Sequence, residues 1–82
     1  MGLAGARGRQ QGLFAPALEK RSLSLERHRT SLALEPEFWI VLERAARMRN
    51  LSLAALIAEI DNGRGERALA SACRVFALSF RD

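Results

Sequence analysis

The sequence predicts a mainly helical fold with a short β-strand, and three observations support this prediction. Polar and apolar residues alternate with period two over residues 30–34, as they do in a half-buried strand. Three segments with apolar residues at helical spacing follow, and they begin near Pro36, Ser52 and Glu66. The chain has 82 residues, which is enough for one domain with a small core.

The N-terminal part of the chain differs from the rest in composition and charge. Residues 1–19 contain Gly2, Gly5, Gly8, Gly12 and Pro16 without any apolar period. We therefore expect residues 1–19 to form a flexible arm and residues 20–82 to form the domain. The net charge of +4 arises within residues 1–29, because acidic and basic residues balance in the remainder. This distribution indicates an anionic partner, with a solubilising tail as the alternative.

Composition also limits how the small core is completed. One cysteine, Cys73, excludes an intrachain disulfide, and one histidine, His28, leaves too few ligands for a structural zinc ion. Oligomerisation remains as the common route to a larger core, and no cofactor is expected. No apolar run is long enough to span a membrane and no signal peptide is recognisable, so we expect a cytoplasmic protein without a membrane partner.

The strand has a core side and an outward side. The core side is expected to hold Thr30, Leu32 and Leu34, and the outward side Arg29, Ser31 and Ala33. Residues 22–25 alternate in the same way, with residues 26–28 as a turn or bend between the two stretches. A lone strand cannot satisfy its backbone hydrogen bonds. Two pairings remain open: a hairpin with residues 22–25, or pairing with a second copy of the chain.

Three helices are expected after the strand. The first begins at Pro36, which suits the first helical position beside acidic neighbours, and ends at Asn50, which tolerates the left-handed conformation. Ser52 is a suitable N-cap for the second, which ends within residues 62–65. The third covers residues 66–80. Its apolar stripe contains Leu69, Cys73, Phe76 and Phe80.

The order and spacing of these elements resemble the ribbon-helix-helix family. Residues 29–39 resemble the strand and first-helix start of that family, and residues 50–57 resemble its turn and second helix. Residues 58–61 and 71–76 are similar to a bacterial subfamily with a C-terminal helical extension. The resemblance implies a ribbon-helix-helix homodimer, with an intermolecular antiparallel β-ribbon and three helices per chain.

The resemblance further implies that the ribbon lies in the major groove of double-stranded DNA. The matching base-facing residues are Arg29, Ser31 and Ala33. Arg29 can donate two hydrogen bonds to guanine, Ser31 can donate or accept, and Ala33 offers an apolar contact such as one to a thymine methyl group. Ala33 departs from the polar residue that such ribbons often carry.

The resemblance also implies phosphate contacts. The N-terminus of the second helix would hold a phosphate through Ser52 and the backbone N–H groups of Leu53 and Ala54. Further phosphate contacts, which position the protein without reading sequence, are expected from Lys20, Arg21 and Arg27.

The sequence therefore predicts a dimeric bacterial DNA-binding protein that regulates transcription and has no catalytic activity. The alternative is a dimeric protein-interaction module of an antitoxin-like kind, whose C-terminal helix binds a protein partner. Its basis is that residues 66–80 carry more apolar side chains than one stripe needs. Cys73 is expected to be a buried apolar residue and not a nucleophile. We expect Phe38 and Trp39 to lie in the core or in the dimer interface.

Overall fold

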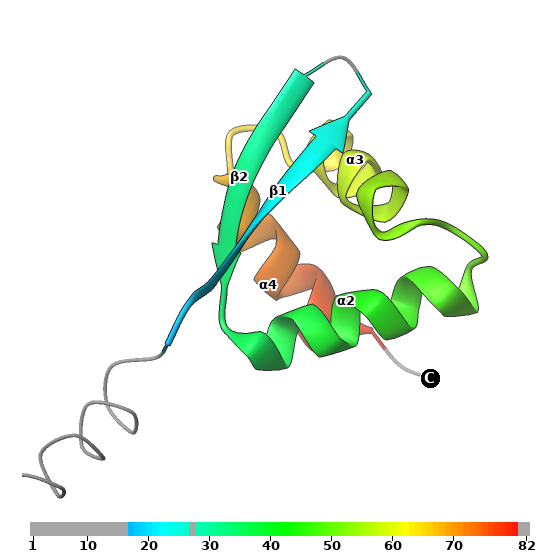
Figure 1. Cartoon of the computed structure of the whole chain (residues 1–82). Coiled ribbons are helices and arrows are strands. Elements are labelled where there is room, and N and C mark those ends of the chain that lie inside the picture. The colour runs from blue at the N-terminus through cyan, green and yellow to red at the C-terminus, as the bar shows by residue number, and fades with distance from the viewer. Residues whose placement is uncertain (1–16, 27, 81–82) are drawn as a thin grey trace, which may run out of the picture.

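The computed structural model describes residues 17–26 and 28–80, so residues 1–16 of the predicted arm lie outside the described part. The elements are β1 (Glu19–Leu25), β2 (His28–Leu34), α2 (Pro36–Met48), α3 (Leu53–Gly63) and α4 (Leu69–Ser79). The two strands form an antiparallel sheet, and the three helices lie together on one side of it (Figure 1). The predicted mainly helical fold is confirmed, with a second strand added.

The antiparallel ribbon is closed within one chain. Leu25 pairs with His28, and Glu26 lies in the turn that joins the two strands. Glu26 has φ 40°, a positive value of the kind that tight hairpin turns require. Of the two pairings that the sequence left open, the structure contains the hairpin. This differs from the ribbon of one strand per chain that the resemblance implied, because β1 supplies the backbone partners that β2 needs. The strand β1 begins at Glu19, the last residue of the expected arm.

The helix boundaries follow local signals where such signals exist. Pro36 opens α2, and Asn50 after its end has φ 59°, as predicted. Ser52 caps α3. The third helix begins at Leu69 instead of residue 66, because a loop with Gly65 at φ 63° precedes it and Ala68 has no side-chain oxygen to cap it.

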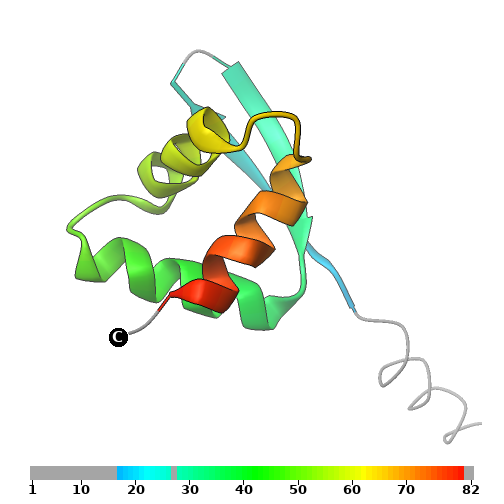
Figure 2. The same ribbon diagram turned by 180° about the vertical axis from the view of Figure 1, so that it is seen from behind.

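The core lies between the hairpin and the helices. Strand β1 packs against α3 and β2 packs against α4, and the view from behind shows the loop between these helices crossing in front of β2 (Figure 2). The most deeply buried large side chains are Leu34, Trp39, Leu42, Leu56, Ile57 and Cys73. Leu32 is buried and Thr30 is half-buried, so the predicted core side of the strand is correct.

Trp39 joins the first helix to the start of the hairpin. Its ring is 1% exposed, and its Nε1 donates a hydrogen bond of 2.8 Å to the carbonyl oxygen of Glu19. The guanidinium of Arg21 lies over the ring, 4.5 Å from its centroid. The indole therefore combines a large apolar contact, a hydrogen bond and a cation–π contact. Its predicted place in the core is confirmed.

Arg74 joins α4 to the start of α2. Its Nε donates a hydrogen bond of 2.9 Å to Glu35 Oε1, and its guanidinium lies 5.8 Å from the centroid of the Phe38 ring. The hydrogen bond from Arg74 is the largest cause of a lowered pKa of the Glu35 carboxyl. The C-terminal helix is thus fixed to the same helix that Trp39 fixes to the hairpin.

Candidate nucleic-acid interface

One face of the hairpin is turned away from the helices. In an antiparallel pair, directly opposite residues lie on the same face. The register pairs Lys20 with Ala33, Ser22 with Ser31, and Ser24 with Arg29. We call this set the outer face: Lys20, Ser22, Ser24, Arg29, Ser31 and Ala33. All of these residues are exposed except Ala33, which is half-buried. The predicted outward direction of Arg29, Ser31 and Ala33 is correct.

The charged side chains of the outer face are all positive. It carries two cations, three hydroxyl groups and one methyl group, and no carboxylate. The cations lie on different strands and at opposite ends, while short side chains occupy the centre. A surface of this kind attracts an anion and allows the strand backbone to approach it closely.

Arg29 is held across the ribbon. Its Nη1 donates a hydrogen bond of 2.9 Å to Ser24 Oγ on the neighbouring strand. A guanidinium has five N–H donors in a fixed plane. One bond to Ser24 therefore restrains the side chain and leaves other donors directed at solvent, where an acceptor can meet them.

Arg21 lies on the opposite face of the hairpin from the outer face. Its Nε contacts Glu19 Oε2 at 2.7 Å and its Nη1 contacts Glu43 Oε2 at 2.6 Å. The hydrogen bond to Glu43 is the main cause of a raised pKa of Arg21, and Glu19 adds to it while burial opposes it. Two carboxylates and the Trp39 ring occupy this guanidinium, so we remove Arg21 from the predicted phosphate-binding set. Lys20 is exposed on the outer face. The position of Arg27 lies outside the described residues.

The N-terminus of α3 borders the same end of the hairpin as Ser24. Ser52 Oγ accepts a hydrogen bond of 3.0 Å from the Ala55 N–H, which confirms the predicted cap. The N–H groups of Leu53 and Ala54, in the first turn, have no acceptor within the helix. A hollow of about 430 Å³ lies between this turn and the hairpin.

Two carboxylates also line that hollow. They belong to Glu26 in the hairpin turn and to Glu59, which pairs with Arg49 at 2.9 Å. The pairing offsets the charge of Glu59, while Glu26 is exposed. The hollow therefore attracts a phosphate less strongly than the helix N-terminus would by itself.

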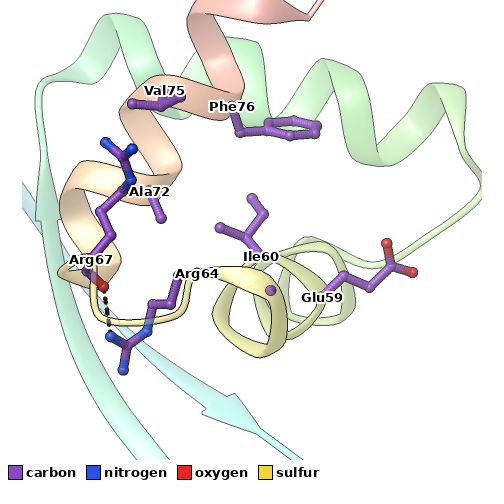
Figure 3. Close-up of a pocket in the computed structure, with 8 residues that line it drawn as sticks. Glu59, Ile60, Arg64, Arg67, Ala72, Val75 and Phe76 are labelled. Carbon is purple, nitrogen blue, oxygen red and sulfur yellow. Dashed lines mark hydrogen bonds between the residues drawn. The ribbon is translucent and has the colours of Figure 1, made fainter.

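A second hollow, of about 400 Å³, lies between α3 and α4. Figure 3 shows Ile60 reaching from α3 into the space below Val75 and Phe76 of α4, with Arg64 and Arg67 on one side. Arg64 donates a hydrogen bond of 2.7 Å to the Arg67 carbonyl oxygen, drawn as the dashed line in Figure 3. This hollow has an apolar wall, and its charged lining residues are Arg64, Arg67 and Glu59, of which Arg64 pairs with Asp61 at 2.6 Å.

Cys73 is fully buried, as predicted. Burial is the main cause that raises the pKa of its thiol from 9.0 to about 11. A thiol that resists ionisation is a poor nucleophile. In the ranges 17–26 and 28–80, no group of three or more His, Cys, Asp or Glu side chains is placed to hold a metal ion. No helix in these same ranges is long and apolar enough to cross a membrane.

Because the folded-state pKa of Cys73 lies above its unfolded value, the protonated thiol stabilises the fold fully below pH 9. That contribution is lost as the pH rises toward about 11. We expect the free energy of unfolding to fall by about 2 kcal/mol over this range. Urea unfolding at pH 8 to 11 measures it, and Cys73→Ala serves as the control. An equal fall in Cys73→Ala would contradict the assignment to Cys73.

Sequence reasoning missed one strand of the interface. The predicted base-facing residues all belong to β2, whereas the hairpin brings Ser22 and Ser24 to the same face. The alternation in residues 22–25 shows that Ser22 and Ser24 share one face of their strand. Only the register shows that this face is the same one that carries Ser31 and Arg29.

Comparison with known proteins identifies a domain family. The family model described as a ribbon-helix-helix domain matches residues 18–80. This range includes both strands and all three described helices. Searches of curated proteins and of solved structures found no match.

Proposed function

The chain belongs to the ribbon-helix-helix domain family, and from this premise we propose that it is a homodimeric DNA-binding regulator of transcription. In this proposal the outer face of the hairpin enters the major groove of double-stranded DNA. Arg29, Ser31 and Ala33 face the base edges. The observation that carries the proposal is the outer face itself, which is exposed, basic and free of carboxylates.

The dimensions of the hairpin agree with those of the groove. Paired strands lie about 4.8 Å apart. The major groove of B-form DNA is about 12 Å wide and admits a two-stranded ribbon. The helices lie behind the ribbon, so they do not obstruct its approach to the duplex (Figure 1).

Phosphate contacts complete the proposed interface. Lys20 lies at the end of the outer face opposite Arg29 and is exposed. The N–H groups of Leu53 and Ala54, together with Ser52, form a helix N-terminus that favours an anion. Such contacts position the protein and do not read the sequence.

Exposed apolar residues support the proposal of a homodimer. Ile40 and Met48 on α2 are 58% and 60% exposed, and Leu78 on α4 is 73% exposed. They lie outside the hairpin, so a second copy that covers some of them leaves the outer face free. Two copies double the number of cations at the duplex and give two half-sites.

The test is a fluorescence-anisotropy titration of labelled random duplex at 50 and 200 mM salt, with sedimentation equilibrium of the same sample. If the four cations that Lys20 and Arg29 of both chains bring to the duplex displace its counterions, we expect affinity to fall roughly 100-fold between the two salt concentrations. Arg29→Ala with Ser31→Ala is expected to weaken binding by about tenfold or more.

Arg67→Ala is the matched control, because it removes one exposed arginine from the loop between α3 and α4. We expect it to bind as the wild type does. A folded wild-type dimer that does not bind DNA at 50 mM salt would contradict the proposal.

A second candidate function, a protein-interaction module of an antitoxin-like kind, is favoured by the α3–α4 hollow. Its apolar wall continues to Val75, which is exposed. A Val75→Asp variant distinguishes the two candidates. Under the second candidate it releases a copurifying protein from the native host, and under the first it leaves DNA binding by the dimer unchanged.

A further inference from the structure

We infer that the hollow between α3 and α4 is a binding site for a small apolar carboxylic acid, whose apolar part fills the hollow and whose carboxylate pairs with Arg67. The hollow measures about 400 Å³ and is lined by residues of both helices and of the loop between them. Ligand pockets in proteins typically measure about 300–1,000 Å³. None of the lining residues belongs to the outer face of the hairpin, so this inference goes beyond the proposed DNA binding.

The wall of the hollow is apolar and comes from both helices. It is formed by Ile60 of α3 and by Ala72, Val75 and Phe76 of α4. Val75 is exposed, and the Ile60 and Phe76 side chains are half-buried. The Phe76 ring stacks on the Phe80 ring with 6.2 Å between centroids, which restrains its orientation. An apolar ligand in this hollow would remove from water a surface that the described part of the chain leaves uncovered.

Arg67 supplies a positive charge at the edge of the hollow. Its side chain is exposed, and Figure 3 shows it extending from the loop alongside α4. Arg64 also lines the hollow, but its Nε donates to Asp61 Oδ1 at 2.6 Å and its Nη1 donates to the Arg67 carbonyl oxygen at 2.7 Å. Arg64 therefore holds the loop in place. In the described part of the chain, the Arg67 guanidinium itself has no hydrogen-bond or ion-pair partner.

The carboxylate of Glu59 also lines the hollow, but it does not oppose an anion at Arg67. Glu59 pairs with Arg49 at 2.9 Å, which offsets its charge. Figure 3 shows the Glu59 carboxylate pointing away from Ile60 and from Arg67. A guanidinium binds a carboxylate through two parallel hydrogen bonds. The position of Arg67 beside an apolar wall therefore matches a ligand with a carboxylate at one end and an apolar group at the other.

The size of the hollow favours a small molecule over a protein. An apolar cavity of about 150 Å³ binds benzene, so the hollow has room for a ring and a short chain, or about twelve non-hydrogen atoms. A stable protein interface covers about 800 Å² on each partner. In the described parts of α3 and α4, the large apolar side chains that are exposed are Val75 and Leu78. These two side chains provide much less apolar surface than a protein partner or a second copy needs.

The experiment is a nuclear magnetic resonance titration of the ¹⁵N-labelled full chain with sodium 4-phenylbutyrate, in which a short chain joins a phenyl ring to a carboxylate. We expect saturable shifts at the wall residues Ile60, Ala72, Val75 and Phe76 and at the Nε–H of Arg67, with a dissociation constant of about 1 mM. The alcohol 4-phenyl-1-butanol has the same ring and chain without the charge. We expect it to bind roughly tenfold more weakly.

Four variants test the charge and the wall separately. Arg67→Ala is expected to weaken phenylbutyrate binding roughly tenfold and to leave phenylbutanol binding unchanged. Arg47→Ala is its matched control, because it removes an exposed arginine from the last turn of α2. Val75→Asp places a carboxylate in the wall and should abolish phenylbutyrate binding, whereas Leu78→Asp adds the same charge to α4 outside the lining and should preserve it. Thermal unfolding confirms that each variant is folded.

Three results would overturn the inference. The first is the absence of saturable shifts at the wall residues of the folded wild type, with a copurifying protein held through Val75 instead. The second is equal affinity for the acid and the alcohol, or equal loss in Arg67→Ala and Arg47→Ala. The third is a shift of the wall residues on dilution without ligand, since a second copy would then cover the hollow. DNA binding is measured without this ligand, so either proposal can fail while the other stands.

Discussion

Replacing Trp39 by alanine is expected to lower the free energy of unfolding by about 4 kcal/mol, since large-to-small changes of a buried Trp cost about 3–5 kcal/mol. The ring is 1% exposed and lies between the hairpin and the helices. The change also removes the donor that pairs with the Glu19 carbonyl oxygen. Domains have about 0.05–0.15 kcal/mol of stability per residue, so for 82 residues this loss takes away about a third of the total or more.

Trp39→Phe isolates the polar part of this effect. Phenylalanine retains most of the apolar volume but cannot donate to Glu19, and we expect a loss of about 1–2 kcal/mol. Urea unfolding followed by far-ultraviolet circular dichroism measures both variants at one protein concentration. A loss below 1 kcal/mol for Trp39→Ala would show that the indole does not join α2 to the hairpin.

Placing a carboxylate at the centre of the outer face should abolish DNA binding. In Ser31→Glu the new charge faces the phosphates and the acceptor-rich base edges, and like charges brought together at an interface cost several kcal/mol. We expect affinity to fall at least about 100-fold, which corresponds to about 3 kcal/mol. Anisotropy titration at 50 mM salt measures this fall.

Two control variants separate the effect of a negative charge at position 31 from the effects of side-chain size and of the protein's net charge. Ser31→Gln introduces a side chain of similar size without the charge, and we expect a much smaller loss. Ser79→Glu adds the same charge on α4, away from the hairpin. Binding by Ser31→Glu within threefold of the wild type would mean that the outer face does not meet DNA.

Short-range patterns predicted most of the fold. Period-two alternation identified both the strand and its two faces, because side-chain direction in a strand depends only on position. Pro36, Asn50 and Ser52 are local signals, and each acts as expected at its helix boundary. The start of α4 was misplaced because its boundary carries no capping side chain.

The features that the sequence did not predict depend on contacts between residues that are far apart in the chain. Alternation shows which face of a strand is buried but not which strand pairs with it, so the hairpin and a second copy could not be distinguished. Arg21 was assigned to phosphate on its charge, but Glu43, 22 residues further along the chain, occupies its guanidinium. The direction of Arg29, Ser31 and Ala33 was correct, and the contribution of β1 required the register.

The central claim is that the outer face of the hairpin meets DNA. The most direct measurement is a two-dimensional nuclear magnetic resonance titration of ¹⁵N-labelled protein with a short duplex at low salt. We expect the largest amide shifts at alternate residues of β1 and β2, led by Ser22, Ser24, Arg29 and Ser31, with smaller shifts at the start of α3. Shifts confined to α2 and α4, with the hairpin unchanged, would contradict the claim.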